Sequence, residues 1–128
     1  IFDPIKNEMF YGDKNNGSYL NNKRIRVSKK KNLEECLFAT NGKKYKNINL
    51  STRKTGSAAL DMAYVAAGRY DGYFQENLNL WDIAAGIIII NEAGGIINSI
   101  DLKKNKSIEV LASSSNINEK MLKKLHNF

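Results

Sequence analysis

The segment from Trp81 to Gly95 constrains the fold of this chain more than any other part of the sequence. An aromatic and an acidic residue are followed by a long apolar run, and the segment closes on a glycine pair. Because glycine favours helix ends, we predict a helix over 82–93 that Gly94 terminates. Asp82 opens this helix, where a metal ion or a substrate hydroxyl can approach. Aspartate is also a favoured N-cap residue, and one carboxylate cannot hold a hard cation such as Mg²⁺. The position alone therefore leaves a structural role open.

A second helix is predicted from the spacing of apolar residues after Ser57. Leu60, Ala63, Tyr64 and Ala67 lie at i, i+3, i+4 and i+7, which indicates a helix over 57–67. Other patterns predict strands over 33–40, with one helical turn at 33–35 before the strand proper, and over 70–75, 95–100 and 108–113. Loops are predicted over 43–55 and 76–80. A last helix is predicted to begin at Asn116 as its N-cap and to run to Leu125. Strands and helices alternate, so this portion is predicted to be α/β.

The first thirty residues predict an antiparallel β meander. Short apolar pieces alternate with turn formers such as Asn15-Asn16-Gly17 and Asn21-Asn22, which tolerate a positive φ. We expect a boundary near Asn32, which separates the meander at 1–32 from the α/β portion at 33–128. The chain opens on Ile1, inside a predicted strand, so we expect it to be a fragment of a longer polypeptide.

The positive charge of the chain raises the question of nucleic-acid binding. The formal net charge is +7, and paired or tripled lysines occur in predicted loops and in the last predicted helix. No aromatic residues are interleaved with these lysines to stack on bases. A solvated surface is therefore the favoured interpretation, and a nucleic-acid-binding patch remains the alternative.

The single cysteine and the apolar runs indicate the cellular compartment in which the protein is expected. Cys36 lies in an apolar run, so we predict a buried thiol in a reducing compartment and a cytoplasmic protein. The longest apolar stretch falls far short of the ~20 residues that a membrane-spanning helix needs. We therefore expect no membrane partner.

Small residues surround the start of the helix predicted at 57–67. The run Thr55-Gly56-Ser57-Ala58-Ala59 leaves free N–H groups and the positive end of the helix dipole accessible. Such an end can accept an anion or a substrate hydroxyl. Ser57 acting only as an N-cap remains the plainer alternative.

Three segments together resemble the inositol monophosphatase family. They are Gly56–Tyr73, the Trp-Asp-x-Ala-Ala-Gly sequence at 81–86, and Glu-Ala-Gly-Gly at 92–95. The Gly-Ser-Ala-Ala-Leu-Asp sequence at 56–61 is similar to the bacterial inositol-1-monophosphatase branch, and less similar to the nucleotidase and histidinol-phosphatase branches. The resemblance covers essentially the whole chain, but only the later part of a family member.

The resemblance implies a fold, an activity and a set of site residues. The fold is the C-terminal part of a layered sugar phosphatase, in which a β meander from the end of the N-terminal domain precedes an α/β sheet covered by helices. The activity is that of a Mg²⁺-dependent phosphomonoesterase that forms homodimers and hydrolyses inositol monophosphate or a similar small polyol phosphate. Asp82 would bind the metal and contact the substrate, and the backbone of Gly56, Ser57 and Ala58 would line the inositol pocket. Gln75 stands where many relatives have a glutamate that accepts a hydrogen bond from a substrate hydroxyl. Its amide still offers a carbonyl acceptor, but no negative charge.

The chain lacks the segments that supply most of the family's metal ligands. These are an upstream glutamate-bearing segment and an Asp-Pro-x-Asp-Gly-Thr motif, and Asp3-Pro4 is followed by the wrong residues to be that motif. We interpret Asp3-Pro4 as the turn after a strand. No complete catalytic set is therefore expected here, and we predict that the chain alone is inactive without its N-terminal segment.

Two alternatives stay open. The first is a related phosphatase that acts on a sugar bisphosphate or a nucleotide bisphosphate. The second is a non-catalytic module that binds nucleic acid or a transcription complex through its positive charge, since some bacterial relatives act with the transcription machinery.

Overall fold

The first 24 residues form the predicted meander. The computed structural model describes all of residues 1–128. Its first four strands are β1 (Phe2–Asp3), β2 (Glu8–Asp13), β3 (Gly17–Leu20) and β4 (Lys23–Arg24), which pair antiparallel in that order. Asn15, Asn21 and Asn22 take positive φ in the turns, as hairpin chemistry predicts. The turn expected at Asp3-Pro4 directly follows β1.

The remaining strands form a five-stranded mixed sheet. They are β5 (Phe38–Ala39), β6 (Thr52–Arg53), β7 (Gly72–Leu78), β8 (Ile96–Ile97) and β9 (Ile108–Ser113), in the spatial order β6-β5-β7-β9-β8. β5 runs parallel to β6 and β7, whereas β9 pairs antiparallel with β7 and β8. This mixture confirms the predicted α/β class.

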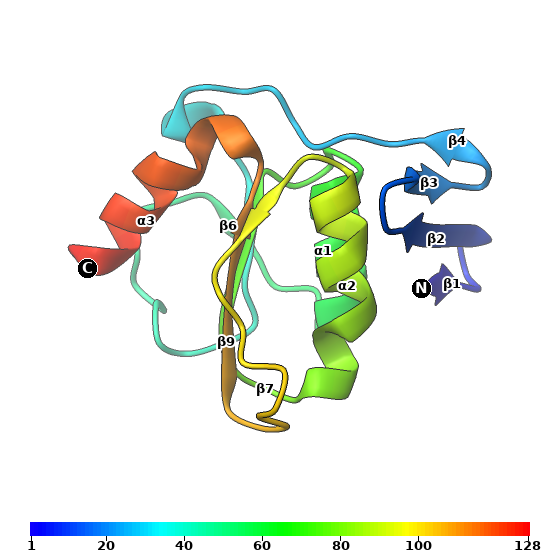
Figure 1. Ribbon diagram of the computed structural model, residues 1–128. Coiled ribbons are helices and arrows are strands. Elements are labelled where there is room, and N and C mark those ends of the chain that lie inside the picture. The colour runs from blue at the N-terminus through cyan, green and yellow to red at the C-terminus, as the bar shows by residue number, and fades with distance from the viewer.

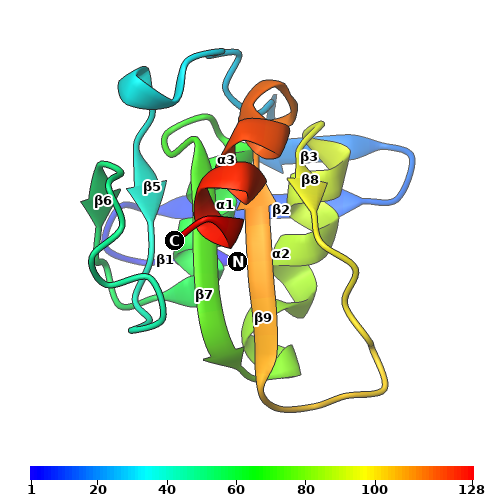
Figure 2. The ribbon, with the colours of Figure 1, turned by 90° about the vertical axis from the view of Figure 1, so that its left-hand side faces the viewer.

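Three α-helices separate and cover the two sheets. They are α1 (Ala58–Ala66), α2 (Leu80–Glu92) and α3 (Asn118–His126). α1 and α2 lie between the five-stranded sheet and the meander, and α3 covers the opposite face of the larger sheet (Figures 1 and 2). The result is a layered arrangement of helix, sheet, helices and sheet. No helix combines the length and the apolar character that crossing a bilayer would demand.

The apolar sequence of α2 follows from its place between two sheets. Ile83 and Ile90 are fully buried in the core. On the side of α1, a Cβ added to Gly86 would lie 2.8 Å from Met62 Cβ, so only glycine allows the two helices to approach this closely. On the side of the meander, Ser18 donates a hydrogen bond to the carbonyl of Ile89 at 2.6 Å. The helix is therefore covered on more than one face.

Two element boundaries near the predicted site differ from the expectation. The helix predicted to open at Asp82 begins at Leu80, and Asn79 occupies the N-cap position. The segment 76–80, predicted as a loop, belongs to β7 as far as Leu78, although its pairing with β9 shifts register after Gln75. Pairing with a distant strand extends β7, and no local pattern carries that information.

Three other predictions needed correction. The segment 43–55 contains the short strand β6, which is stabilised by parallel pairing with β5. The strand predicted at 95–100 is regular only at β8. Beyond it, Asn98 bonds to β9 through both its backbone N–H and its side chain. Asn116 does not cap α3. It lies in a 3-10 turn at Ser115–Ile117, and its amide donates to the carbonyl of Lys29.

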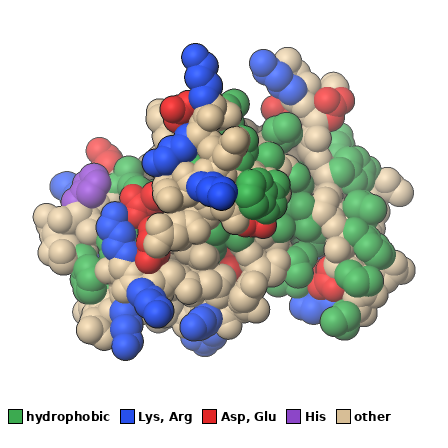
Figure 3. All heavy atoms as spheres, turned by 90° about the horizontal axis from the view of Figure 1, so that it is seen from below, with side chains coloured by type: hydrophobic (Ala, Val, Ile, Leu, Met, Phe, Trp, Pro, Cys, Tyr) green, Lys and Arg blue, Asp and Glu red, His purple; other side chains and the backbone are tan.

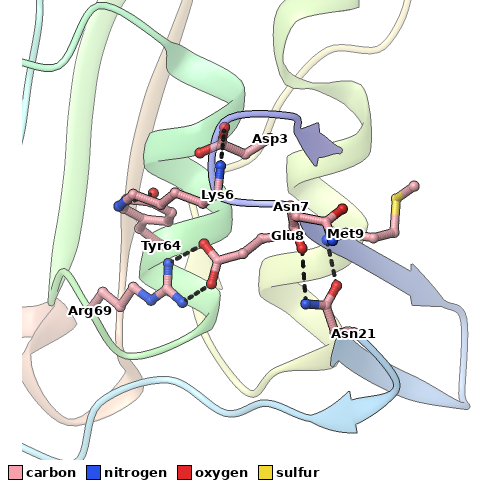
Figure 4. A network of polar contacts seen from close by, with 8 residues as sticks. All are labelled: Asp3, Lys6, Asn7, Glu8, Met9, Asn21, Tyr64 and Arg69. Atoms are coloured by element: carbon pink, nitrogen blue, oxygen red, sulfur yellow. Dashed lines mark hydrogen bonds and ion pairs between the residues drawn. The ribbon is translucent and has the colours of Figure 1, made fainter.

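A polar network links the meander to the end of α1. Arg69 donates to Glu8 at 2.8 Å and lies over the ring of Tyr64, whose hydroxyl accepts a hydrogen bond from Lys6 at 3.0 Å (Figure 4). Arg69 and Asp71 flank a turn but do not pair with each other. Arg69 pairs with Glu8, and Asp71 accepts from the backbone of Leu37.

The outer face of the meander carries exposed apolar side chains. Phe2, Ile5 and Met9 are 48%, 93% and 43% exposed. Apolar atoms gather over this part of the molecule at the right of Figure 3. Phe10, one residue further along β2, is fully buried, and its ring lies 5.9 Å from that of Tyr64 in α1. The alternation follows from the two-residue period of a strand, and it leaves one face of the sheet uncovered within these residues.

Candidate active site

A cavity of about 310 Å³ lies where α1, β7 and α2 meet. Its lining consists of Asn41, Gly56, Ser57, Ala58, Ala59, Gln75, Leu78 and Asp82. All five site residues expected from the sequence are among them. They come from segments up to 26 positions apart, from 56 to 82, and the fold brings them to one place.

The N-terminus of α1 forms one wall of this cavity. Gly56 has a φ of +89°, and no atom lies within 4 Å of the position of a Cβ there, so the backbone is open to a ligand. Ser57 caps the helix by accepting from the backbone of Leu60 at 3.2 Å. The N–H groups of Ala58 and Ala59 have no partner in the preceding turn. Ser57 therefore caps the helix and also lines the cavity.

Asp82 lines the same cavity from the first turn of α2. Its carboxylate is exposed and has one long contact, 3.4 Å from the side-chain amide of Asn79. Because Asn79 occupies the N-cap position, the N-cap interpretation of Asp82 is wrong. The carboxylate does not bond to the amides of its own helix, and it is left available to a ligand. Trp81 beside it is 66% exposed and is not part of the core.

The described residues do not form a metal site by themselves. No group of three or more His, Cys, Asp or Glu side chains is placed to hold a metal ion. A carboxylate oxygen is the kind of ligand that Mg²⁺ prefers, but the ion needs about six oxygen ligands. Asp82 fits the chemistry of such a site, and the remaining ligands would have to come from outside these 128 residues or from water.

Gln75 lines the cavity from β7, and its side chain is hydrogen-bonded to Tyr73. The Tyr73 hydroxyl is buried and donates to Gln75 Oε1 at 2.6 Å. Burial, with the negative charges of Asp61 and Asp82 nearby, raises the pKa of Tyr73 well above its usual range, so the hydroxyl keeps its proton. The amide carbonyl expected to face the substrate is therefore already engaged by the protein.

Asp61 is connected through Asn41 to the backbone that lines the cavity, and the sequence did not indicate a role for it. It is fully buried, it accepts from Thr55, and it accepts from the amide of Asn41 at 2.8 Å. Asn41 in turn accepts from the backbone of Gly56 at 2.9 Å. Burial raises the pKa of Asp61, while the bonds from Thr55 and Asn41 oppose that rise. The one signal in the sequence is an acidic residue on a helix that is otherwise apolar.

Comparison with known proteins identifies the family. A model of the inositol monophosphatase family matches residues 1–128. The chain belongs to the inositol monophosphatase family. The inositol-1-monophosphatase of Caulobacter vibrioides is 34% identical, over 97% of this chain and 56% of the relative. The Nus factor SuhB of Haemophilus influenzae is 36% identical, over 98% and 53%.

The solved structures of the family confirm the layered fold. The crystal structure of the extragenic suppressor protein SuhB from Bartonella henselae has a TM-score of 0.88 at 37% identity. It covers 98% of this chain, which in turn covers 57% of that chain. The present chain thus spans about half the length of the relatives that it matches.

We predict that Asp61→Asn changes how the stability of the protein depends on pH. Because the pKa of Asp61 is raised in the folded state, the folded protein binds more protons between about pH 4 and the raised pKa. This carboxyl therefore makes the free energy of unfolding fall as the pH rises through that range. The asparagine side chain of the variant does not titrate, so the fall should be smaller in the variant, as measured by urea unfolding from about pH 4 to about pH 7.

The matched control is Asp101→Asn, which removes an exposed carboxylate. Its profile should follow that of the wild type. If the free energy of unfolding of the Asp61 variant varied with pH in parallel with the wild type, Asp61 would not have the raised pKa that burial is expected to cause. This holds whatever the absolute loss of stability.

Proposed function

We propose that this chain is the C-terminal part of a Mg²⁺-dependent phosphomonoesterase that hydrolyses inositol monophosphate or a similar small polyol phosphate. One observation carries the proposal. The exposed carboxylate of Asp82 faces the same cavity as the open N-terminus of α1. Membership of the family supports the reaction class, and a relative from Caulobacter vibrioides is named inositol-1-monophosphatase.

Each wall of the cavity has a distinct role in this proposal. Asp82 would hold the metal ion together with ligands from outside the described residues. Bound Mg²⁺ lowers the pKa of a coordinated water and offsets charge on phosphoryl oxygens. The backbone of Gly56, Ser57 and Ala58 would orient the alcohol part of the substrate, because no side chain blocks its approach. Asp61 and Asn41 would hold that backbone in place.

The proposal extends to the assembly and the compartment. We propose a cytoplasmic homodimer, in which a further segment of the polypeptide supplies the missing ligands. The exposed apolar face of the meander supports such a neighbouring segment. Cys36 is 3% exposed, and burial raises the pKa of its thiol to about 11, which suits an unreactive thiol in a reducing compartment.

Replacing Asp82 tests the metal-ligand role. In the full-length protein we expect Asp82→Asn to lower kcat/KM for inositol 1-phosphate by at least about 10²-fold, because the amide loses the charge that binds the ion. Trp81 adjoins Asp82, so titration of its fluorescence with Mg²⁺ should show the parallel loss of affinity. Glu119→Gln removes an exposed carboxylate of α3 and should change neither quantity. Wild-type activity and Mg²⁺ affinity in the Asp82 variant would exclude the assignment.

The chain by itself should be inactive. With one carboxylate in the cavity, the purified 128-residue chain should release no phosphate from inositol 1-phosphate above the rate of a buffer control with Mg²⁺. Release of inorganic phosphate is the measurement, and circular dichroism shows whether the chain is folded. Turnover by the folded chain at the rate of the full-length protein would refute this prediction.

A second candidate function is favoured by a basic groove on α3. The groove has a volume of about 590 Å³ and is lined by Asn47, Ile48, Asn49, Lys120, Lys123, Lys124, Asn127 and Phe128. Phe128 is 56% exposed beside the lysines, although the sequence showed no aromatic residue between them. A cationic groove with one aromatic side chain suits single-stranded RNA. The relative from Haemophilus influenzae is named a Nus factor, which supports a role in a transcription complex.

Salt dependence and charge removal test this second function. If RNA binds in the groove, its affinity should fall steeply with salt, by about 0.7 logarithmic units per phosphate contact for each tenfold rise. Lys123→Gln with Lys124→Gln should weaken binding more than the control pair Lys103→Gln with Lys104→Gln, which lies in an exposed loop. Fluorescence anisotropy with a labelled oligonucleotide is the measurement. Absence of binding at low salt would exclude this function.

A further inference from the structure

The chain contains two Asn-Gly dipeptides, Asn16-Gly17 and Asn41-Gly42. Asparagine is a thermolabile residue, because the backbone nitrogen of the next residue can attack its side-chain carbonyl carbon and expel ammonia. Glycine in the next position permits this reaction best, since it has no Cβ to hinder the approach and its backbone is adaptable. Both dipeptides therefore have the intrinsic chemistry for deamidation, and the structure decides which of them can react.

The fold requires both residues of the second dipeptide. The Asn41 amide donates to Asp61 Oδ2 at 2.8 Å and accepts from the backbone of Gly56 at 2.9 Å, whereas a carboxylate in its place could not donate. A Cβ at Gly42 would overlap the carboxylate of Glu76, which accepts from the backbone N–H groups of the next two residues. The reactive sequence at this place thus follows from packing and hydrogen bonding.

The groups around Asn41 are those that the reaction uses. The N–H of Gly42, which carries the attacking nitrogen, makes no hydrogen bond within the chain. Gly56 donates to Asn41 Oδ1, the oxygen on which negative charge develops in the tetrahedral intermediate. Asp61 is bonded to the nitrogen that leaves. Burial raises the pKa of Asp61, which favours the form that can supply a proton to that nitrogen.

The first dipeptide lacks a free attacking group. The N–H of Gly17 donates to Glu92 Oε1 at 3.0 Å, so a bond to a carboxylate must break before this nitrogen can attack. The Asn16 amide donates to Asp13 at 2.8 Å, and no group of the chain donates to its side-chain oxygen. The two dipeptides thus share one sequence and differ in the state of the attacking nitrogen.

We propose that Asn41 is a site of spontaneous deamidation in the folded protein. The Gly42 nitrogen forms a bond with Asn41 Cγ, and its proton passes to solvent. The bond from Cγ to Nδ2 breaks, and the departing nitrogen takes up a proton and leaves as ammonia, so that the first product is a cyclic succinimide. Water then opens the ring at either carbonyl, which leaves aspartate or isoaspartate at this position.

The product alters the wall of the cavity that Asn41 lines. An aspartate there has no N–H to donate to Asp61, and it places a second negative charge beside a buried carboxylate. An isoaspartate also adds one carbon to the main chain, which displaces the oxygen that accepts from Gly56. Because we propose that the substrate alcohol binds at Gly56, this consequence for activity rests on the proposed phosphatase function. The chemical change itself does not depend on that function.

Peptide mapping measures both dipeptides in one sample. The full-length protein is held at physiological temperature and neutral pH, digested with trypsin and compared by tandem mass spectrometry with a sample taken at time zero. Deamidation raises the mass of peptide 32–43 or of peptide 15–23 by about one dalton. In the folded protein Asn41 should react at least about fivefold faster than Asn16. In the urea-unfolded protein the two rates should agree within about twofold, because the surroundings of the two dipeptides are lost.

Glu92→Ala tests why the first dipeptide is protected. The variant frees the N–H of Gly17, so Asn16 should deamidate several-fold faster than in the wild type, while the rate at Asn41 stays the same. Asp101→Asn removes an exposed carboxylate and should alter neither rate. Circular dichroism shows whether each variant is folded. The proposal is overturned if Asn41 of the folded protein reacts no faster than Asn16, or if folded Glu92→Ala leaves the rate at Asn16 unchanged.

Asn41→Asp reproduces one product and tests the consequence for activity. In the full-length protein it should lower kcat/KM for inositol 1-phosphate by about tenfold or more, whereas the control Asn16→Asp should leave kcat/KM unchanged. If Asn41 deamidates but the fresh protein does not hydrolyse inositol 1-phosphate, the phosphatase function fails and the modification site stands. If the protein is active and Asn41 keeps its amide, the function stands and this inference fails.

Discussion

The burial of α2 between two sheets is the constraint on which the rest of the structure depends. A helix covered by a sheet on one side and by a meander and a second helix on the other must be apolar around most of its circumference. Gly86 permits the close approach of α1, and the backbone at Ile89 is bonded to the meander. The first turn of α2 carries two exposed residues, Trp81 and Asp82, and Asp82 lines the cavity.

The packing of α2 against the meander also explains why Glu92 stands at the other end of the helix. Glu92 opposes the helix dipole near the C-terminus of α2, where a negative charge is normally unfavourable. Its two carboxylate oxygens accept from the backbone of Asn15 and Gly17, each at 3.0 Å. The turn between β2 and β3 is thus attached to the helix. Glu92 has a structural role that no local pattern indicates, because its partners lie 77 and 75 residues away in the chain.

The candidate site is built in the same way, from short segments held by distant partners. The start of α1 is fixed through Asn41 and Asp61, and Gln75 is fixed through Tyr73. Residues that face the cavity could be expected from the sequence, since small residues at a helix start and a family motif both point to them. Residues that support the cavity could not, because a buried aspartate and a buried tyrosine look like ordinary core positions until their partners are known.

The sequence by itself determined the meander, the three helices, the α/β class and the family, because turn residues and apolar spacing are local signals and the motif at 81–95 is specific. The tertiary structure decided where α2 begins, that β6 exists, and which partners Arg69 and Asp71 take. It also decided which end of the Gln75 amide is free. These features depend on hydrogen bonds between segments far apart in the chain, and such bonds are specified by the packing of the whole molecule rather than by neighbouring residues.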